Sequence, residues 1–299
     1  MPAASAKPAF SRVALIGKLR TPEIAASLRA LRQMLQKRGC EVLLESDTAT
    51  GLGARGASYD TIGKNADLAI VVGGDGTMLA AARNLVRHRV PLTGVNQGRL
   101  GFMTDIGHED MRRGIGGILA GRYTVEERSL LDARIVRGAR TLLKTLALNE
   151  AVLGKGAQGR LIEFDLSIDG EFVYTLRADG VIVATPTGST AYALSAQGPI
   201  LHPAVPALAL VPLNPHTLSA RPVSISDRSS IEIKLVRALD ARAHFDGFAL
   251  TDMAEGDRLL LKRSANTIRL VHPAGYRYFA TLREKLRWSE GLDKKRDLE

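Results

Sequence analysis

The most constraining feature of the sequence is a short apolar run that ends in a glycine-rich turn. Residues 67–72 are too few for a helix and rich in β-branched side chains, which predicts a strand covered on both faces. The sequence GGDGT at residues 73–77, here called the glycine turn, interrupts this run. Apolar residues at helical spacing follow over residues 78–88. A buried strand, a turn and a helix in succession are typical of a parallel sheet covered by helices.

Neighbouring segments repeat the same alternation of strand and helix. Thr21, Pro22 and Glu23 supply a helix N-cap, a proline at the first helical position and an early acid, so a helix is expected to about Arg38. Its apolar side chains recur at helical spacing. Further strands are predicted at residues 13–17, 41–45 and 91–95. The first part of the chain is therefore predicted to be a doubly wound α/β domain.

The pattern changes after Arg128 to short alternating runs separated by glycine and aspartate, which predict antiparallel strands. These runs cover residues 130–136, 162–168, 172–176 and 231–236. A chain of 299 residues also lies where a single core usually splits. The predicted fold class is α/β plus β. Its predicted parts are an N-terminal domain at 1–128, a C-terminal β-rich domain at 129–274, and a tail at 275–299 that returns to the N-terminal domain.

The charge of the chain favours small anionic ligands over nucleic acid. The formal net charge is +10, but the basic residues are spread along both halves, and the longest basic run is Lys294, Lys295 and Arg296. A nucleic-acid binder usually concentrates its positive charge on one helix or arm. A basic surface without a specific ligand is an equally open interpretation.

The single cysteine and the absence of a long apolar stretch predict a cytoplasmic protein. Cys40 cannot form an internal disulfide, which fits a reducing compartment, and its place between a helix and a strand predicts a buried structural thiol. No segment approaches 18 consecutive apolar residues. Neither a membrane nor a nucleic acid is expected as a partner.

The glycine turn is a candidate phosphate site because it follows the carboxyl end of a predicted buried strand, where ligands of such sheets bind. Glycine lets the backbone approach a ligand closely, and the first amides of the following helix can donate hydrogen bonds to phosphate oxygens. The candidate phosphate-binding residues are Gly73, Gly74, Gly76 and Thr77.

Asp75 is the unexpected member of the glycine turn. A carboxylate among phosphate-binding amides repels the anion unless it handles a proton or a metal, so Asp75 is the candidate catalytic residue. The alternative is that Asp75 only caps the next helix. No P-loop motif occurs, and Leu79 stands where the dinucleotide fingerprint requires Gly or Ala, so neither of these better-known phosphate motifs is present.

A second candidate begins with a predicted strand at residues 181–184. Residues 185–190, here called the hydroxyl turn, read Thr-Pro-Thr-Gly-Ser-Thr and precede Ala191 and Tyr192. Hydroxyl and amide donors at a helix start suit phosphate or ribose, and Tyr192 could pack on a base. The alternative is an ordinary capped turn with a core tyrosine.

Two residue pairs could complete a nucleotide site. Asn149 and Glu150 could contact a base edge and ribose hydroxyls, although a solvated strand end is the simpler interpretation. Arg177 and Asp179 alternate along one strand face and could point at one ligand, or could equally form surface ion pairs.

These motifs together resemble the NAD kinase family. GGDGT alone is weak evidence because lipid kinases and, in related form, phosphofructokinases carry it, but the ordered set extends across most of the chain. The set comprises residues 73–77, Gly94-Val95-Asn96 with Leu100-Gly101-Phe102, Asn149-Glu150, residues 185–192, Ser195 and Gly198-Pro199-Ile200.

The resemblance implies a Rossmann-like N-terminal domain with a parallel sheet, an antiparallel C-terminal β domain, an active site between them, and a homodimer or homotetramer. It implies that Asp75 draws the proton from the 2'-hydroxyl of the adenosine ribose of NAD. Mg2+, or another divalent metal, and the glycine-rich backbone would hold the phosphates of ATP, and the product would be NADP.

The resemblance also implies a set of dinucleotide contacts. An arginine at position 177 resembles the ATP-using members of the family, and Phe102 would add an aromatic wall. One departure is Phe248, since many members carry glutamine two residues after the position of Asp246. The implied NAD-binding residues are Asp75, Gly76, Phe102, Asn149, Glu150, Arg160, Arg177, Asp179, Thr187, Thr190, Ala191, Tyr192, Ala193, Leu194 and Ser195.

Two alternative functions are weighed beside NAD phosphorylation. A lipid kinase of the diacylglycerol or sphingosine type would share GGDGT, but the sequence lacks the basic amphipathic helix expected at a membrane surface. A non-catalytic protein that binds a dinucleotide or a nucleic acid would show no phosphoryl transfer, and its binding to DNA would depend steeply on salt.

Overall fold

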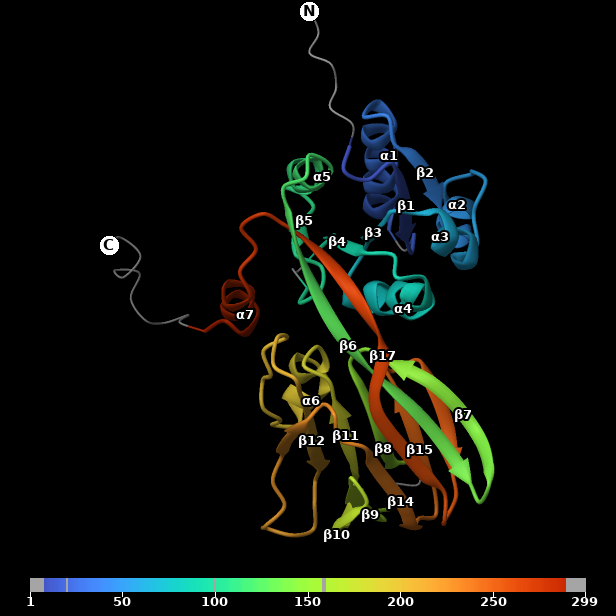
Figure 1. Ribbon diagram of the computed structural model, residues 1–299, viewed down its shortest axis with the longest axis vertical. Helices are drawn as coiled ribbons and strands as arrows, with labels where there is room; N and C mark the ends of the chain where they lie inside the picture. The colour runs from blue at the N-terminus through green and yellow to red at the C-terminus, as the bar shows by residue number, and fades with distance from the viewer. Residues whose placement is uncertain (1–7, 20, 99–100, 158–159, 289–299) are drawn as a thin grey trace, which may run out of the picture. The chain divides into compact units, whose positions relative to one another are not determined.

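The computed structural model describes residues 8–19, 21–98, 101–157 and 160–288 (Figure 1). The chain divides into two compact units. Unit 1 comprises residues 1–126 and 269–299, and unit 2 comprises residues 127–268. Among the described residues, no helix is both long enough and apolar enough to cross a membrane.

Unit 1 contains a parallel sheet, as the alternating strand and helix pattern predicts. Its strands lie in the order β4, β3, β1, β2, and every pair among them is parallel. β5 and the end of β17 also pair with β4 in parallel. The strands of this unit are β1 (Arg12–Gly17), β2 (Glu41–Leu44), β3 (Leu68–Val72), β4 (Leu92–Asn96) and β5 (Ile106–Gly107).

Helices cover this sheet because they carry apolar stripes at helical spacing. In α1 (Pro22–Lys37), Leu28, Leu31 and Leu35 are fully buried in the core that also contains Leu15 and Ile70. Cys40 is buried as expected. The other helices of the unit are α2 (Ser46–Gly51), α3 (Tyr59–Asn65), α4 (Asp75–Leu85), the short 3-10 helix η1 (Val86–His88), α5 (Met111–Leu119) and α7 (Tyr278–Leu286).

The helix after the glycine turn starts earlier than predicted. α4 begins at Asp75 rather than at Met78, and its N-cap is Gly74. The apolar periodicity starts at Met78 and therefore marks only the buried part of the helix, whereas the first turn carries no core side chain. The alternative in which Asp75 caps this helix is wrong, because Asp75 is the first helical residue.

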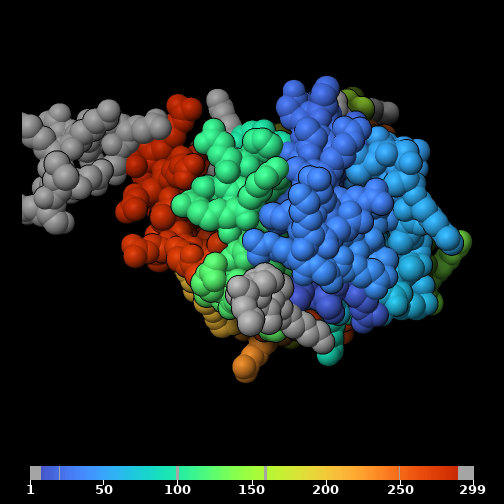
Figure 2. Space-filling view, turned by 90° about the horizontal axis from the view of Figure 1, so that it is seen from above, coloured from blue at the N-terminus to red at the C-terminus, as the bar shows by residue number. Residues whose placement is uncertain are grey.

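The C-terminal segment belongs to unit 1. β17 (Arg258–Pro273) begins in unit 2, and its last residues, with α7, belong to unit 1. Figure 2 shows the red segment that contains α7 beside the green segment that contains α5, and both line one cavity. Residues 289–299 of the predicted tail lie outside the described residues.

Unit 2 consists mainly of antiparallel strands in two sheets, as the short alternating runs predict. In the first sheet the order is β10, β9, β14, β17, β6, β7, with the chain entering along β6. The second sheet has the order β13, β12, β11, β8, β15, β16, and all of its pairs are antiparallel. The first sheet contains β6 (Tyr123–Arg137), β7 (Arg140–Ala147), β9 (Ile162–Ile168), β10 (Glu171–Ala178) and β14 (Ile231–Arg237). The second contains β8 (Glu150–Lys155), β11 (Gly180–Ala184), β12 (Ala207–Leu213), β13 (Val223–Ser226), β15 (Ala241–Phe245) and β16 (Ala249–Met253).

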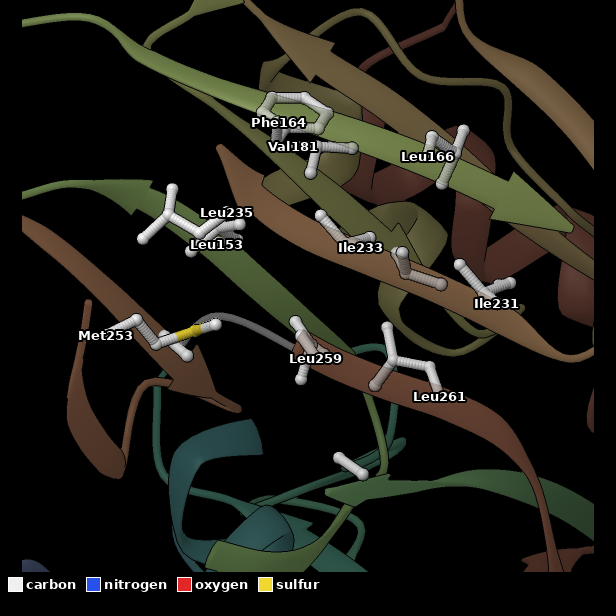
Figure 3. Close-up of a cluster of buried hydrophobic side chains, with 14 of the residues drawn as sticks. Leu153, Phe164, Leu166, Val181, Ile231, Ile233, Leu235, Met253, Leu259 and Leu261 are labelled. Carbon is white, nitrogen blue, oxygen red and sulfur yellow. The ribbon is translucent and has the colours of Figure 1, made fainter. Parts of the chain in front are cut away.

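Side chains from both sheets form one buried cluster in unit 2. Phe164 and Ile233 come from the first sheet, and Leu153 and Val181 come from the second (Figure 3). All four are fully buried. Alternating residues of each strand face inward, so the period of two in the sequence becomes the inner faces of a sandwich. A short 3-10 helix, η2 (Gly188–Thr190), and α6 (Tyr192–Ser195) follow β11.

Replacing Phe164 by Ala should lower the free energy of unfolding by about 3–5 kcal/mol, because the lost apolar contacts and the cavity both destabilise the core. Phe172 on the neighbouring strand is 60% exposed, so Phe172→Ala is a matched control with a change within about 0.5 kcal/mol. Urea unfolding of both variants measures the difference. Equal losses would contradict the assignment of Phe164 to the core.

Candidate functional site

The glycine turn is formed by a strained glycine followed by an open helix start. Gly73 has a φ of 153°, and a Cβ there would lie 2.8 Å from Thr77 Oγ1, so a side chain is disfavoured. Its N–H donates to Val95 O at 2.9 Å, which fixes the turn to β4. Gly74 and Gly76 are exposed, and a Cβ on either would meet open space. A ligand can therefore approach the first amides of α4.

The Asp75 carboxylate is held by a neighbouring loop of unit 1. Oδ2 accepts a hydrogen bond from Phe102 N at 2.9 Å, and Oδ1 accepts from Met103 N at 3.1 Å and Thr104 Oγ1 at 3.2 Å. Residues 102–104 are here called the carboxylate loop. Hydrogen bonds to a charged acceptor are stronger than those between neutral groups, so the loop fixes the direction of the carboxylate.

Gly101 and Asn96 make this arrangement possible. A Cβ on Gly101 would collide with Asp75 Oδ1 and Thr104 Oγ1, so only glycine lets the loop approach so closely. Asn96 is buried at the end of β4, and its Nδ2 donates to Thr104 Oγ1 at 2.9 Å. Asn96 and Gly101 therefore have a structural role, which is to hold the carboxylate loop against Asp75.

Unit 2 contains a cavity of about 480 Å³ that Glu150 lines, and Asn149 directly precedes Glu150 in the chain. Both of these residues are more than nine-tenths buried. Within the described part of the chain, Asn149 Oδ1 and Glu150 Oε2 have no hydrogen-bond partner. Buried polar atoms are normally paired, so these two acceptors are candidates for contact with a ligand or with water. The cavity lining includes Glu150, Val152, Gly154, Lys155, Asp179, Tyr192, Leu213, Asn214, His244 and Gly247.

Asp246 holds the backbone of this pair of residues. Its carboxylate accepts from Leu148 N at 2.8 Å, Asn149 N at 2.7 Å and Glu150 N at 3.2 Å. Asp246 itself is buried and has a φ of 53°, a conformation that aspartate tolerates better than most residues. Burial, and then the nearby charge of Asp246, raise the pKa of Glu150 to about 7. Glu150 can therefore either donate or accept a proton near neutral pH.

Three side-chain hydroxyls of the hydroxyl turn donate to backbone carbonyls of the turn itself or of Leu148. Thr185 Oγ1 donates to Leu148 O at 2.5 Å, and Ser189 Oγ donates to Pro186 O at 2.7 Å. Thr190 Oγ1 donates to Thr187 O at 3.2 Å. These hydroxyls therefore fix the turn and the chain before Asn149.

Gly188 lies directly against this chain, and a Cβ there would collide with the backbone of Asn149. Thr187 is also engaged, since its Oγ1 accepts from the buried Arg128 Nη1 at 3.3 Å. The hydroxyl turn and the Asn149 segment form one packed structure in unit 2.

The structure brings some of the other candidates to the cavity. Tyr192, at the start of α6, is 48% exposed and lines the cavity with its ring available to a ligand. Asp179 also lines it and is paired with Lys155 at 2.7 Å and Asn214 at 2.9 Å. The hydrogen bonds from Asn214 and Lys155 lower the pKa of Asp179, so this carboxylate is charged.

Other candidates are not gathered at the cavity. Arg177 lies 3.9 Å from Glu163 across the β9–β10 pair, which is the surface ion pair left open as the alternative. Arg160 and Ser195 are exposed, and Ala193 is buried beneath α6. Phe248 is 51% exposed after the turn at Asp246.

Sequence reasoning missed four contributors to these sites. Thr104 Oγ1 donates to the Asp75 carboxylate, and the Asp246 carboxylate accepts from the backbone of residues 148–150, while Lys155 and His244 line the cavity of unit 2. The sequence marked Asp246 only as a position in the family pattern and as part of an Asp-Gly pair, and gave no indication of its backbone partners. No local pattern marks a residue whose partners are about 97 positions away.

An α/β unit with a carboxylate at a glycine-lined helix start, and a β unit with a cavity lined by the buried, unpaired Glu150, fit a nucleotide-dependent phosphotransferase. Two family models match the chain, the ATP-NAD kinase N-terminal domain at residues 13–123 and the ATP-NAD kinase C-terminal domain at residues 148–273. The chain belongs to the NAD kinase family, and it is a kinase.

Curated relatives and solved structures agree with this assignment. The chain is 58% identical to an NAD kinase of Aromatoleum aromaticum, with 94% of this chain and 95% of the relative covered. It is 55% identical to an NAD kinase of Azoarcus sp., with coverage of 94% and 97%. Yeast NADH kinase complexed with NADH has a TM-score of 0.88 at 25% identity, with 98% of this chain and 94% of that chain covered. An Archaeoglobus fulgidus NAD kinase in complex with ATP has a TM-score of 0.74 at 26% identity, with coverage of 91% and 99%.

Glu150→Gln should stabilise the protein increasingly as pH rises. The folded state raises the pKa of Glu150 from 4.5 to about 7, so the buried acid is favourable when neutral and loses this contribution as pH rises through about 7. The glutamine stays neutral throughout. The gain in Tm over wild type should therefore be larger at about pH 8 than at about pH 5.

Glu171→Gln is the matched control, because it removes the same charge from an exposed site on β10. Its effect on Tm should change little between the two pH values. A Glu150→Gln gain that does not depend on pH would contradict the raised pKa.

Proposed function

We propose that the chain transfers the γ-phosphoryl group of ATP to the 2'-hydroxyl of the adenosine ribose of NAD and so makes NADP. The observation that carries the proposal is the Asp75 carboxylate, fixed by the carboxylate loop at the open start of α4. The names of the curated relatives support the reaction, and two similar structures are described as complexes with NADH and with ATP.

Asp75 acts as the general base in this proposal. The ribose oxygen attacks the γ-phosphorus, the bond from that phosphorus to the bridging oxygen breaks, and ADP leaves. The hydroxyl proton passes to the Asp75 carboxylate. Phosphoryl transfer depends mainly on alignment and charge stabilisation, so one well-directed carboxylate is sufficient for this role.

The glycine turn binds phosphate through its backbone. Gly74 and Gly76 leave the helix start open, and the amides and dipole of α4 favour an anion there. Gly73 N–H donates to Val95 O and Thr77 N–H donates to Gly74 O, so both residues fix the shape of the turn. These residues hold phosphate oxygens while Asp75 handles the proton.

Asn149 and Glu150 hold the dinucleotide in this proposal, because their buried acceptors need a donor. Base amino groups and ribose hydroxyls are donors of this kind. Tyr192 and Asp179 add an aromatic surface and a charged acceptor to the same cavity. The remaining proposed contacts are Gly76, Phe102, Arg160, Arg177, Thr187, Thr190, Ala191, Ala193, Leu194 and Ser195.

A divalent cation, Mg2+ in the simplest case, would enter with the phosphates of ATP. In this proposal the ion would be bound mainly by substrate oxygens and water, as Mg2+ commonly is with nucleotide phosphates. When bound, the ion neutralises phosphate charge. We further propose that the chain forms a homodimer or homotetramer and works in the cytoplasm.

Asp75→Asn should reduce NADP formation about 10²- to 10⁴-fold while the protein stays folded, because the amide keeps the shape but cannot take the proton. Asp60→Asn is the control, since Asp60 is an exposed carboxylate paired with Lys64 in the same unit. The measurement is NADP production from NAD, ATP and Mg2+, with circular dichroism as a check on folding. A folded Asp75→Asn variant with the wild-type rate would refute the proposed role.

ATP should be a far better phosphoryl donor than inorganic polyphosphate, in keeping with an arginine at position 177. The assay compares the two donors at equal phosphoryl concentration with NAD as acceptor. Equal rates would contradict the proposed donor, while leaving the acceptor and the role of Asp75 in place.

A further inference from the structure

A buried histidine in unit 1 lies between two carboxylates. His272 Nδ1 is 3.0 Å from Asp105 Oδ2, and His272 Nε2 is 3.2 Å from Glu126 Oε2. The side chain of His272 is only 2% exposed. Both ring nitrogens face acceptors, so the protonated imidazole, which donates from both, satisfies the geometry best. Asp105, His272 and Glu126 are here called the histidine clasp.

The histidine clasp fastens three separate segments of unit 1. His272 lies near the end of β17, Glu126 lies in the first part of β6, and Asp105 immediately precedes β5. Tyr276 stacks on the imidazole with ring centroids 3.9 Å apart and planes 8° apart. The clasp is therefore a buried interaction that joins these segments, not a surface ion pair.

Asp105 directly follows the carboxylate loop. Phe102, Met103 and Thr104 donate to Asp75, and the next residue is held by His272. A loop of three residues between two anchors has little freedom, so the position of Asp105 sets the direction of the donors that hold Asp75. A break at the clasp would release the loop at its C-terminal end.

We propose that His272 is a positioning residue for phosphoryl transfer, which acts through Asp105 and the carboxylate loop to orient Asp75. This inference rests on the proposed role of Asp75 as the base. His272 does not touch a substrate in this mechanism. It holds the loop in the geometry that aims the Asp75 carboxylate.

The electrostatics of the clasp agree with this role. Burial alone lowers the pKa of His272, but the hydrogen bonds and charges of Asp105 and Glu126 outweigh it, so the pKa is raised. The ring is therefore charged below the raised pKa, and the clasp weakens as pH rises through it. Besides the stacked Tyr276, the adjoining cavity of about 580 Å³ is lined by the charged residues Asp105, Asp110, Arg113, Arg122, Arg277 and Glu284.

Two substitutions of His272 distinguish its interaction with Asp105 from its interaction with Glu126. An asparagine amide can take the place of Nδ1 and keep the bond to Asp105, whereas a glutamine amide reaches the position of Nε2 and favours Glu126. We expect His272→Gln to lower kcat about tenfold, with the KM values for NAD and ATP within about twofold of wild type. We expect His272→Asn to retain most of the wild-type kcat.

The coupling to Asp75 is tested in a double variant. If His272 acts through Asp75, adding His272→Gln to Asp75→Asn should cause little further loss, so the two effects are not additive. Amide hydrogen exchange at Phe102 and Met103 should also be faster in His272→Gln. His88→Gln is the control, since His88 lies 3.8 Å from the exposed Asp60 in the same unit, and its kcat should match wild type.

The results separate this inference from the proposed function. An Asp75→Asn variant with full activity would refute both. Loss of activity in Asp75→Asn with wild-type kcat in a folded His272→Gln would overturn only the positioning role, as would fully additive losses or unchanged exchange at the carboxylate loop. If His272→Gln does not fold, Asp105→Asn takes its place with the same expected fall in kcat and the same exchange measurement.

Discussion

Backbone amides that converge on a carboxylate are the interaction on which both candidate sites depend. In unit 1 the carboxylate loop donates to Asp75, and in unit 2 three successive amides donate to Asp246. Charge-assisted hydrogen bonds are short and directional, and their loss leaves a buried charge unsatisfied. Such carboxylates therefore fix the chain segments that donate to them.

In unit 2 the same arrangement makes it less favourable for Glu150 to be ionised. Asp246 orders the chain at Asn149 and Glu150, but its charge and the burial of the site raise the pKa of Glu150 to about 7. The unpaired acceptors of Asn149 and Glu150 add to this cost in the free protein. A ligand that donates to them would relieve part of it, so local instability here is consistent with a binding site.

The elements that follow from side-chain periodicity were predictable. The buried strand β3, the helix α1 with its proline at the first turn, and the alternating strands of unit 2 all have local signals in the sequence. The start of α4 was misplaced by three residues because its first turn is glycine-rich and lies outside the core. For Arg177 the sequence left a ligand contact and a surface ion pair equally open, and the structure shows an ion pair with Glu163 on the neighbouring strand.

The sequence by itself determined the parallel and antiparallel sheets, the glycine turn with its single acid, and the family. Each of these follows from contiguous residues or from motifs in a fixed order. Only the tertiary structure decided which groups hold those residues in place. The partners of Asp75 are 27–29 positions away, those of Asp246 are 96–98 away, and His272 meets Asp105 across 167 positions. Such contacts depend on how the chain packs, since hydrogen bonds between distant segments form only where the sheets and loops bring donors and acceptors together.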